Sequence, residues 1–308
     1  MPILDDLKAL NLDVAHVNLW TVKGPVGPIS QAPTYPAKWV ETTAPLDASL
    51  KQIFTEQLEL IEEVFAYGLL AQNNEASALS IPADETHVPS LLAAIAAETA
   101  PLKVSQTKHL LNTNFYVAKI IVGDDIAYAV KKTAKSWKTK QAHSVRSAIF
   151  QDQVLTVDEQ PHFELSRSFD FIVFGEDVLI LDKGKFESVL RYRQAQQSAF
   201  VDLQNEVEFQ NLFVDMAPLI AHVGANKIQL RRACAIRDKG HYRDMGFMDR
   251  LRANQAEYGL MITFDANGRI IATPETCAQI MTALLDHRLK SGFSTLVYDV
   301  QDTTPIQV

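Results

Sequence analysis

The residues of this chain best suited to binding chemistry are bases that crowd into one short segment. Residues 131–146 hold six lysines and arginines and no aspartate or glutamate. Lysine and arginine neutralise phosphate groups, and an indole among them can stack on a nucleic-acid base or sugar. One alternative stays open, in which Trp137 anchors an ordinary solvated segment to the core. The pattern predicts a DNA-binding segment with these candidate residues: Lys131, Lys132, Lys135, Trp137, Lys138, Lys140 and Arg146.

A second concentration of bases follows further along the chain. Residues 227–252 hold eight lysines and arginines against three aspartates. Arg231 and Arg232 belong to a run of bases at helical spacing, which makes them candidates to reinforce the first segment. A helix surface with ordinary salt bridges explains the same pattern, and this alternative also stays open.

The whole chain is acidic in spite of these two segments. Its 308 residues carry a formal net charge of −8 at pH 7. The net charge argues against a general nucleic-acid coat protein, whereas the uneven distribution favours a positive face on an acidic body. Any contact with DNA is therefore expected to be local, non-specific and sensitive to salt.

Motifs for catalysis are missing from the sequence. It has no GxSxG, HExxH, CxxC or glycine-rich phosphate loop in a strand-to-helix setting. Cys234 and Cys277 lie in apolar helical contexts, where burial raises the pKa of a thiol. We therefore predict no enzyme activity, no catalytic residue, no metal site and no cofactor. The enzyme alternative is a metal-dependent nuclease that uses Asp170 and Asp182, although the lysines after Asp182 miss the usual acid–any–lysine spacing.

Hydrophobic periodicity and turn residues indicate the elements that must position these side chains. Strands arrive in hairpins and helices in separate blocks, which predicts an α+β fold of antiparallel hairpin-based sheets with flanking helices. The predicted division is an N-terminal α/β region at 1–150 and a C-terminal region at 151–308. The expected strands are 16–22, 115–122, 126–131, 154–157, 163–174, 178–182, 260–264 and 269–272, and the expected helices are 47–71, one from 90, several over 185–258 and one from 273.

The start of the chain and its apolar stretches indicate the cellular location of the protein. The N-terminus carries acids where a signal peptide would carry bases. The most apolar stretch, residues 90–99, is about half of the ~20 residues that span a bilayer. Two cysteines suit a reducing compartment. We therefore expect a cytoplasmic protein without a membrane segment of its own.

The second predicted hairpin carries a family resemblance. Residues 163–192 read FELSRSFDFIVFGEDVLILDKGKFESVLRY. This stretch resembles the hallmark of KwaB-like proteins, the cytoplasmic subunit of the Kiwa bacterial anti-phage system. The resemblance continues in RRACAIRDKGHYRDMGFMDRLRANQAEYGLMITFDANGRII and in LLDHRLKSGFSTLVYDV, so that it covers roughly the C-terminal half of the chain.

The resemblance implies a DNA-binding effector that works with a separate transmembrane subunit, KwaA. Such an effector engages phage DNA and blocks its replication or expression, at the inner face of the cell membrane through its partner. The resemblance offers no established catalytic residues, so none are assigned to this chain. Because one protomer of this acidic chain offers few phosphate contacts, we expect a homodimer or higher homo-oligomer that pools its patches. A nuclease, or a non-catalytic subunit that binds protein or lipid headgroups, remains the alternative.

Overall fold

The computed structural model describes residues 2–28, 31–133, 148–151, 154–157, 163 and 165–300. The chain forms two compact units. The first contains Met1–Tyr67 and Gln72–Arg191, and the second contains Gly68–Ala71 and Tyr192–Val308. The sequence-based division at residue 150 differs from this one. β9 and β10, which lie beyond residue 150, pair with strands of the N-terminal region and so belong to the first unit.

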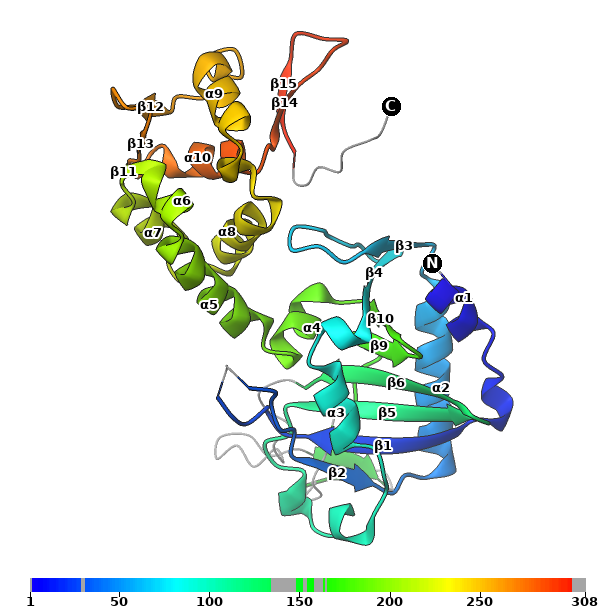
Figure 1. The fold of residues 1–308 in the computed structure, drawn as a ribbon. Helices are drawn as coiled ribbons and strands as arrows, with labels where there is room; N and C mark the ends of the chain where they lie inside the picture. Colours follow the sequence, from blue (N-terminus) through cyan, green and yellow to red (C-terminus); the bar gives the residue numbers. More distant parts are fainter. Residues whose placement is uncertain are drawn as a thin grey trace. The chain divides into compact units, whose positions relative to one another are not determined.

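An eight-stranded sheet organises the first unit, in the order β2-β1-β5-β6-β9-β10-β4-β3 (Figure 1). Neighbouring strands are antiparallel except for β3 and β4. The strands are β1 (His16–Val22), β2 (Ala37–Val40), β3 (Glu63–Ala66), β4 (Ser77–Pro82), β5 (Phe115–Val122), β6 (Asp125–Lys132), β9 (Phe171–Phe174) and β10 (Asp177–Ile180), and a separate hairpin joins β7 (Ala148–Gln151) to β8 (Val154–Val157).

Two tight hairpins make the centre of this sheet. β5 turns into β6 at Gly123, and β9 turns into β10 at Gly175. Both glycines have positive φ, 61° and 57°, a backbone conformation that two-residue hairpin turns require and glycine adopts without a steric penalty. The predicted hairpins are therefore present. The strand expected at 163–174 is shorter than predicted, because regular pairing begins only at Phe171.

Helices cover both faces of the sheet. On one face lies α2 (Ala44–Glu59), which buries Leu50, Phe54 and Leu58 at a spacing of one helical turn. α1 (Pro2–Lys8) packs beside α2. On the other face lie α3 (Val88–Ala94) and α4 (Lys183–Val189), and Phe186 of α4 meets Phe171 edge to face with ring centroids 5.2 Å apart (Figure 1).

The helix predicted over 47–71 is wrong in its second half. α2 ends at Glu59, and residues 63–66 form β3 instead. Ile61 and Val64 pack on the same core cluster as α2. The apolar pattern therefore continues beyond the end of α2, although residues 63–66 are a strand. Hydrophobic spacing alone does not separate these two cases in a short apolar run.

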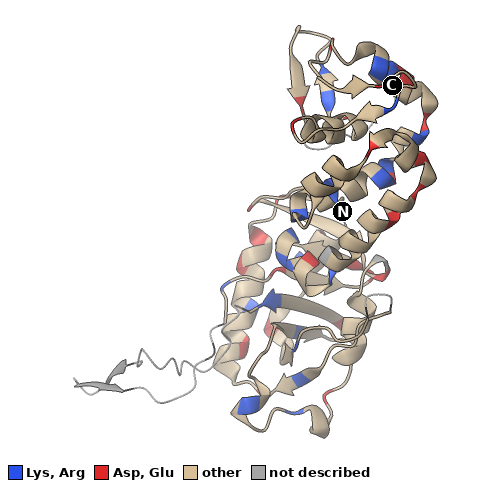
Figure 2. Ribbon diagram, turned by 90° about the vertical axis from the view of Figure 1, so that its left-hand side faces the viewer, with Lys and Arg blue, Asp and Glu red and all other residues tan. Residues whose placement is uncertain are grey.

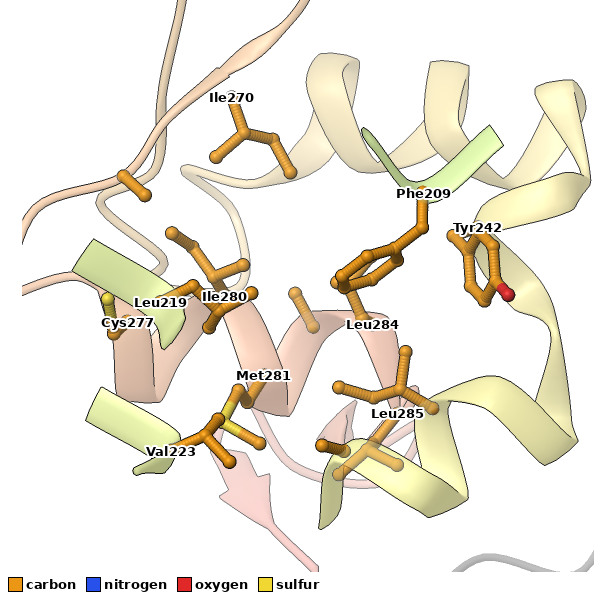
Figure 3. Packing of buried hydrophobic residues seen from close by; sticks show 14 of the residues in the cluster. Phe209, Leu219, Val223, Tyr242, Ile270, Cys277, Ile280, Met281, Leu284 and Leu285 are labelled. Carbon is orange, nitrogen blue, oxygen red and sulfur yellow. The ribbon is translucent and has the colours of Figure 1, made fainter. Parts of the chain in front are cut away.

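Helices make up most of the second unit. They pack around α10 and the residue that follows it, where Ile280, Leu284 and Leu285 meet residues from several other helices (Figure 3). Cys234 and Cys277 are buried in this unit, and burial raises the pKa of the Cys234 thiol to about 11. The helices are α5 (Tyr192–Asn205), α6 (Val207–Asn211), α7 (Ala217–Val223), α8 (Lys227–Lys239), α9 (Met245–Asn254) and α10 (Cys277–Leu284).

Short strands complete the second unit. β12 (Thr263–Phe264) and β13 (Ile270–Ile271) form the predicted return around residues 265–268, and β11 (Phe213–Asp215) joins them. A last hairpin pairs β14 (Arg288–Lys290) with β15 (Val297–Asp299). The α+β prediction of antiparallel hairpin-based sheets with flanking helices is confirmed. Across the described ranges, no helix has the length and apolar character that crossing a membrane requires.

Candidate nucleic-acid interface

The predicted DNA-binding segment begins on the last two residues of β6. Lys131 Nζ donates a hydrogen bond to Asp170 Oδ1 at 2.7 Å. The backbone N–H of Lys132 donates to the other oxygen of the same carboxylate, also at 2.7 Å. Asp170 is only 1% exposed, so both bonds lie away from solvent. The carboxylate thus fixes the position at which the basic segment leaves the sheet.

The backbone of Asp170 is itself held by two other stretches of backbone. Its N–H donates to the carbonyl of Val130, and its own carbonyl accepts from the N–H groups of Leu181 and Asp182. The preceding residue, Phe169, exchanges two hydrogen bonds with the side-chain amide of Gln57 on α2. Because the backbone cannot shift without breaking these bonds, the carboxylate stays opposite the end of β6.

The electrostatics of Asp170 combine two opposing effects. Burial raises the pKa of the carboxyl, since the ionised form is taken out of water. Hydrogen bonds from Lys131 and from the Lys132 amide act in the opposite direction, and the nearby Asp182 adds to the rise. Lys131 therefore supplies the counter-charge that a buried carboxylate needs.

The two lysines point to opposite faces of the sheet, as neighbouring residues of a strand do. Lys132 Nζ donates to the hydroxyl of Ser188 on α4. The next residue, Thr133, anchors the chain through its hydroxyl, which donates to the carbonyl of Thr113 at 2.7 Å. Both lysine side chains are thus bonded within the first unit.

The other predicted contacts of this segment have no structural description. The structure resumes at β7, so it gives only the two ends between which the bases lie. The predicted DNA-binding residues that lie outside the described ranges are Lys135, Trp137, Lys138, Lys140 and Arg146.

Arg231 and Arg232 lie on α8 of the second unit, and both are half-buried. The guanidinium of Arg232 donates to Thr282 Oγ1 on α10 at 2.8 Å. Burial lowers the pKa of Arg232, an effect that Asp299 partly offsets. Arg232 is therefore packed against α10, where part of its hydrogen-bonding capacity is used.

Other bases of the second segment form ion pairs that the sequence did not reveal. Arg237 Nε donates to Glu206 Oε1 at 3.0 Å, and Arg243 Nη2 donates to Glu206 Oε2 at 2.6 Å. The acid comes from the turn between α5 and α6, so no local spacing could have predicted it. Figure 2 shows bases and acids interspersed along the described elements of each unit.

The acids of the nuclease alternative have structural partners. Asp170 is bound as described above, and Asp182 Oδ1 accepts from the N–H of Lys185 at 2.9 Å, which caps α4. Among the residues whose placement is described, no three histidine, cysteine, aspartate or glutamate side chains gather as metal ligands would.

Comparison with known proteins gives one match. The family model described as Kiwa protein KwaB-like matches residues 110–293. No curated protein and no solved structure matches the chain. The matched region starts just before β5 and ends beyond β14, so it includes the Lys131–Asp170 pair, the basic segment and most of the second unit. This match covers more than half of the sequence, and the chain therefore belongs to the KwaB-like family, which implies that it is a component of Kiwa anti-phage defence.

Proposed function

We propose that this chain is a DNA-binding effector of Kiwa defence. It binds DNA without sequence preference through residues 131–146 and so blocks the replication or expression of phage DNA. One observation carries the proposal: six bases without an acid extend from a strand end that the buried Asp170 holds in place. A fixed origin supports binding, because less conformational freedom is lost when DNA is bound.

The structure suggests different roles for the bases in this segment. Lys131 and Lys132 are bonded to Asp170 and Ser188, which suits them to hold the start of the segment. The phosphate contacts are then made by Lys135, Lys138 and Lys140, while Trp137 stacks on a base or sugar. In the second unit, Arg231 is the candidate to reinforce the contact with DNA. Arg232 can contribute only with the N–H groups that its hydrogen bond to Thr282 leaves unused.

Fluorescence anisotropy of labelled DNA across a salt series tests the proposal. Affinity should fall steeply as salt increases, with a slope of about 0.9 per phosphate contacted on a logarithmic plot. Lys135→Glu/Lys138→Glu should weaken binding at low salt at least about tenfold, and two lost contacts should reduce the slope by about two. Unchanged binding would overturn the assignment of the segment.

The matched control is Lys23→Glu/Lys108→Glu. It changes the net charge by the same amount at two exposed lysines outside the proposed segment. If both double variants weaken binding equally, the effect belongs to overall charge and not to residues 131–146. Magnesium-dependent cleavage of the probe that is lost in Asp182→Ala would instead indicate a nuclease.

The partners form the second part of the proposal. The chain is cytoplasmic, and a transmembrane KwaA-like subunit binds another of its surfaces. This partner holds it at the inner face of the membrane. Copies of the chain associate as a homodimer or higher homo-oligomer, because one segment offers few phosphate contacts to an acidic protein. Sedimentation measures the oligomer, and co-purification with the membrane subunit measures the partnership. Firm co-purification without any DNA binding would favour a pure interaction subunit.

A further inference from the structure

A cavity of about 400 Å³ lies within the second unit, beside α9 and the start of β14. This volume falls in the range of roughly 300–1,000 Å³ that small-molecule sites occupy. Every residue that lines the cavity belongs to the second unit and to its described part. None of the lining residues belongs to residues 131–146, so the cavity needs its own explanation.

The cavity offers an apolar and aromatic surface. Leu251, Leu260 and Ala283 supply aliphatic contacts, and the aromatic residues Phe247 and Tyr258 line the same space. Phe247 is stacked on His241, with ring centroids 4.9 Å apart and an interplanar angle of 16°. A ring held in this way loses little freedom when a flat ligand packs near it. The surface thus suits a planar, aromatic group.

Cations line the same cavity. Arg250, Arg288 and Lys290 contribute to its wall, against a single lining acid, Asp286. Arg288 is fixed, because it donates to the carbonyl of Tyr258 at 2.9 Å and to Asp299 Oδ1 at 2.5 Å. Because Asp299 already compensates the charge of Arg288, the cations that could bind an anionic group are Arg250 and Lys290.

Two of these cations can exchange partners. Arg250 is 69% exposed and lies 3.7 Å from Asp244, which is itself 61% exposed. Lys290 pairs with Glu257, whose side chain is also more than half exposed. Such solvent-exposed ion pairs contribute little to stability, so an anionic ligand can replace the carboxylates at small cost.

We propose that this cavity binds a nucleotide. The base packs against Phe247 and Tyr258, and the phosphate is bound by Arg250 and Lys290. The exposed carboxylate of Asp286 accepts a hydrogen bond from a ribose hydroxyl or an amino group. The same chemistry is offered by a free nucleotide and by the terminal nucleotide of a single DNA strand, and the experiment separates these sources.

Isothermal titration calorimetry of the full chain with ADP, in the absence of DNA, tests the proposal. We expect saturable binding that is stronger than binding of adenosine or inorganic phosphate alone. Arg250→Glu should weaken it at least about tenfold, the effect of losing a charged hydrogen-bond donor. Tyr258→Leu, which keeps the apolar packing but removes the aromatic ring, should weaken it as well.

Lys227→Glu is the matched control, because it makes the same change of charge at an exposed lysine of this unit that does not line the cavity. ADP binding that survives in this control and is lost in Arg250→Glu supports the site. Displacement of ADP by a short single-stranded oligonucleotide supports a strand end as its source, and the lack of displacement supports a free nucleotide.

Two results would overturn the proposal. One is ADP binding that Arg250→Glu leaves unchanged, and the other is the absence of ADP binding at millimolar concentration. Circular dichroism confirms that each variant is folded. The result is independent of the DNA-binding proposal, since Lys135→Glu/Lys138→Glu should leave ADP binding as it is.

Discussion

Lys131 Nζ and Asp170 Oδ1 lie 2.7 Å apart and join the end of β6 to the residue just before β9. Their side chains are 16% and 1% exposed, so the pair is largely removed from water. Buried ion pairs add little net stability when both partners are present, but the loss of one partner leaves an uncompensated charge. The pair therefore specifies where the basic segment begins. Replacing Lys131 and replacing Asp170 should have different, measurable effects on stability.

Asp170→Asn should destabilise the first unit. The variant leaves the Lys131 ammonium beside a neutral amide, and we expect the free energy of unfolding to fall by about 3 kcal/mol. Urea denaturation followed by tryptophan fluorescence measures this, because Trp20 and Trp39 lie within the first unit and the sequence of the second unit contains no tryptophan. The control is Glu176→Gln at an exposed turn position. A variant as stable as the control would show that the pair has no such role.

Lys131→Met should also destabilise the fold, with a characteristic pH dependence. Burial already raises the pKa of Asp170 above 3.8, and loss of the ammonium removes an opposing effect. The folded state then binds a proton that the unfolded chain releases between pH 3.8 and the raised value. Because the wild-type pKa is itself above 3.8, the deficit relative to the wild type should shrink as the pH falls from the higher folded-state pKa of the variant to that of the wild type. Urea denaturation at a series of pH values checks this prediction.

Lys131→Met also tests whether Lys131 only positions the basic segment or contacts DNA itself. We expect Lys131→Met to leave the salt slope of DNA binding unchanged, in contrast to Lys135→Glu/Lys138→Glu, because Lys131 Nζ is already bonded to Asp170. A slope reduced by about one would instead mean that Lys131 contacts a phosphate.

Glu206→Gln should weaken the second unit in a way that depends on pH. Burial raises the pKa of Glu206, but hydrogen bonds from Tyr242 and from Arg243 and Arg237 outweigh it and hold the pKa below 4.5. The stabilisation is present above pH 4.5 and is lost as the pH falls through the lowered value. We expect a deficit of about 1–2 kcal/mol at pH 7 that disappears in acid.

Far-ultraviolet circular dichroism during urea unfolding measures this deficit, since the second unit is rich in helix. Glu208→Gln, two residues away and exposed, is the control; it removes only the weakest of the effects on Arg243 and should show a much smaller deficit. A deficit that persists at acid pH would contradict the ionic origin.

Gly175→Ala should test the turn between β9 and β10. The glycine has a φ of 57°, and a Cβ there would meet nothing within 4 Å, so the cost is backbone strain alone. We expect about 1 kcal/mol of lost stability by tryptophan fluorescence. Gly184→Ala, in the first turn of α4 without positive φ, should cause no loss. Equal stability of the two variants would show that the turn does not require the left-handed conformation.

Local chemistry in the sequence was enough to predict the hairpins. Runs of apolar and β-branched residues on either side of Gly123 and Gly175 predict antiparallel pairs, because strand preference and turn geometry act over a few residues. The same locality explains the failure after Glu59. Ile61 and Val64 belong to the core in either conformation, and only pairing of β3 with β4 makes this stretch a strand.

The sequence by itself determined the α+β character, the two concentrations of bases and the family. Tertiary structure decided which bases are bonded within the fold. Lys131 and Asp170 are 39 residues apart, and they meet because β6 pairs with β9. Arg237 and Glu206 are 31 apart and come from different helical segments. A charge pattern records which residues are present, whereas strand register and helix packing set the distances on which an ion pair depends.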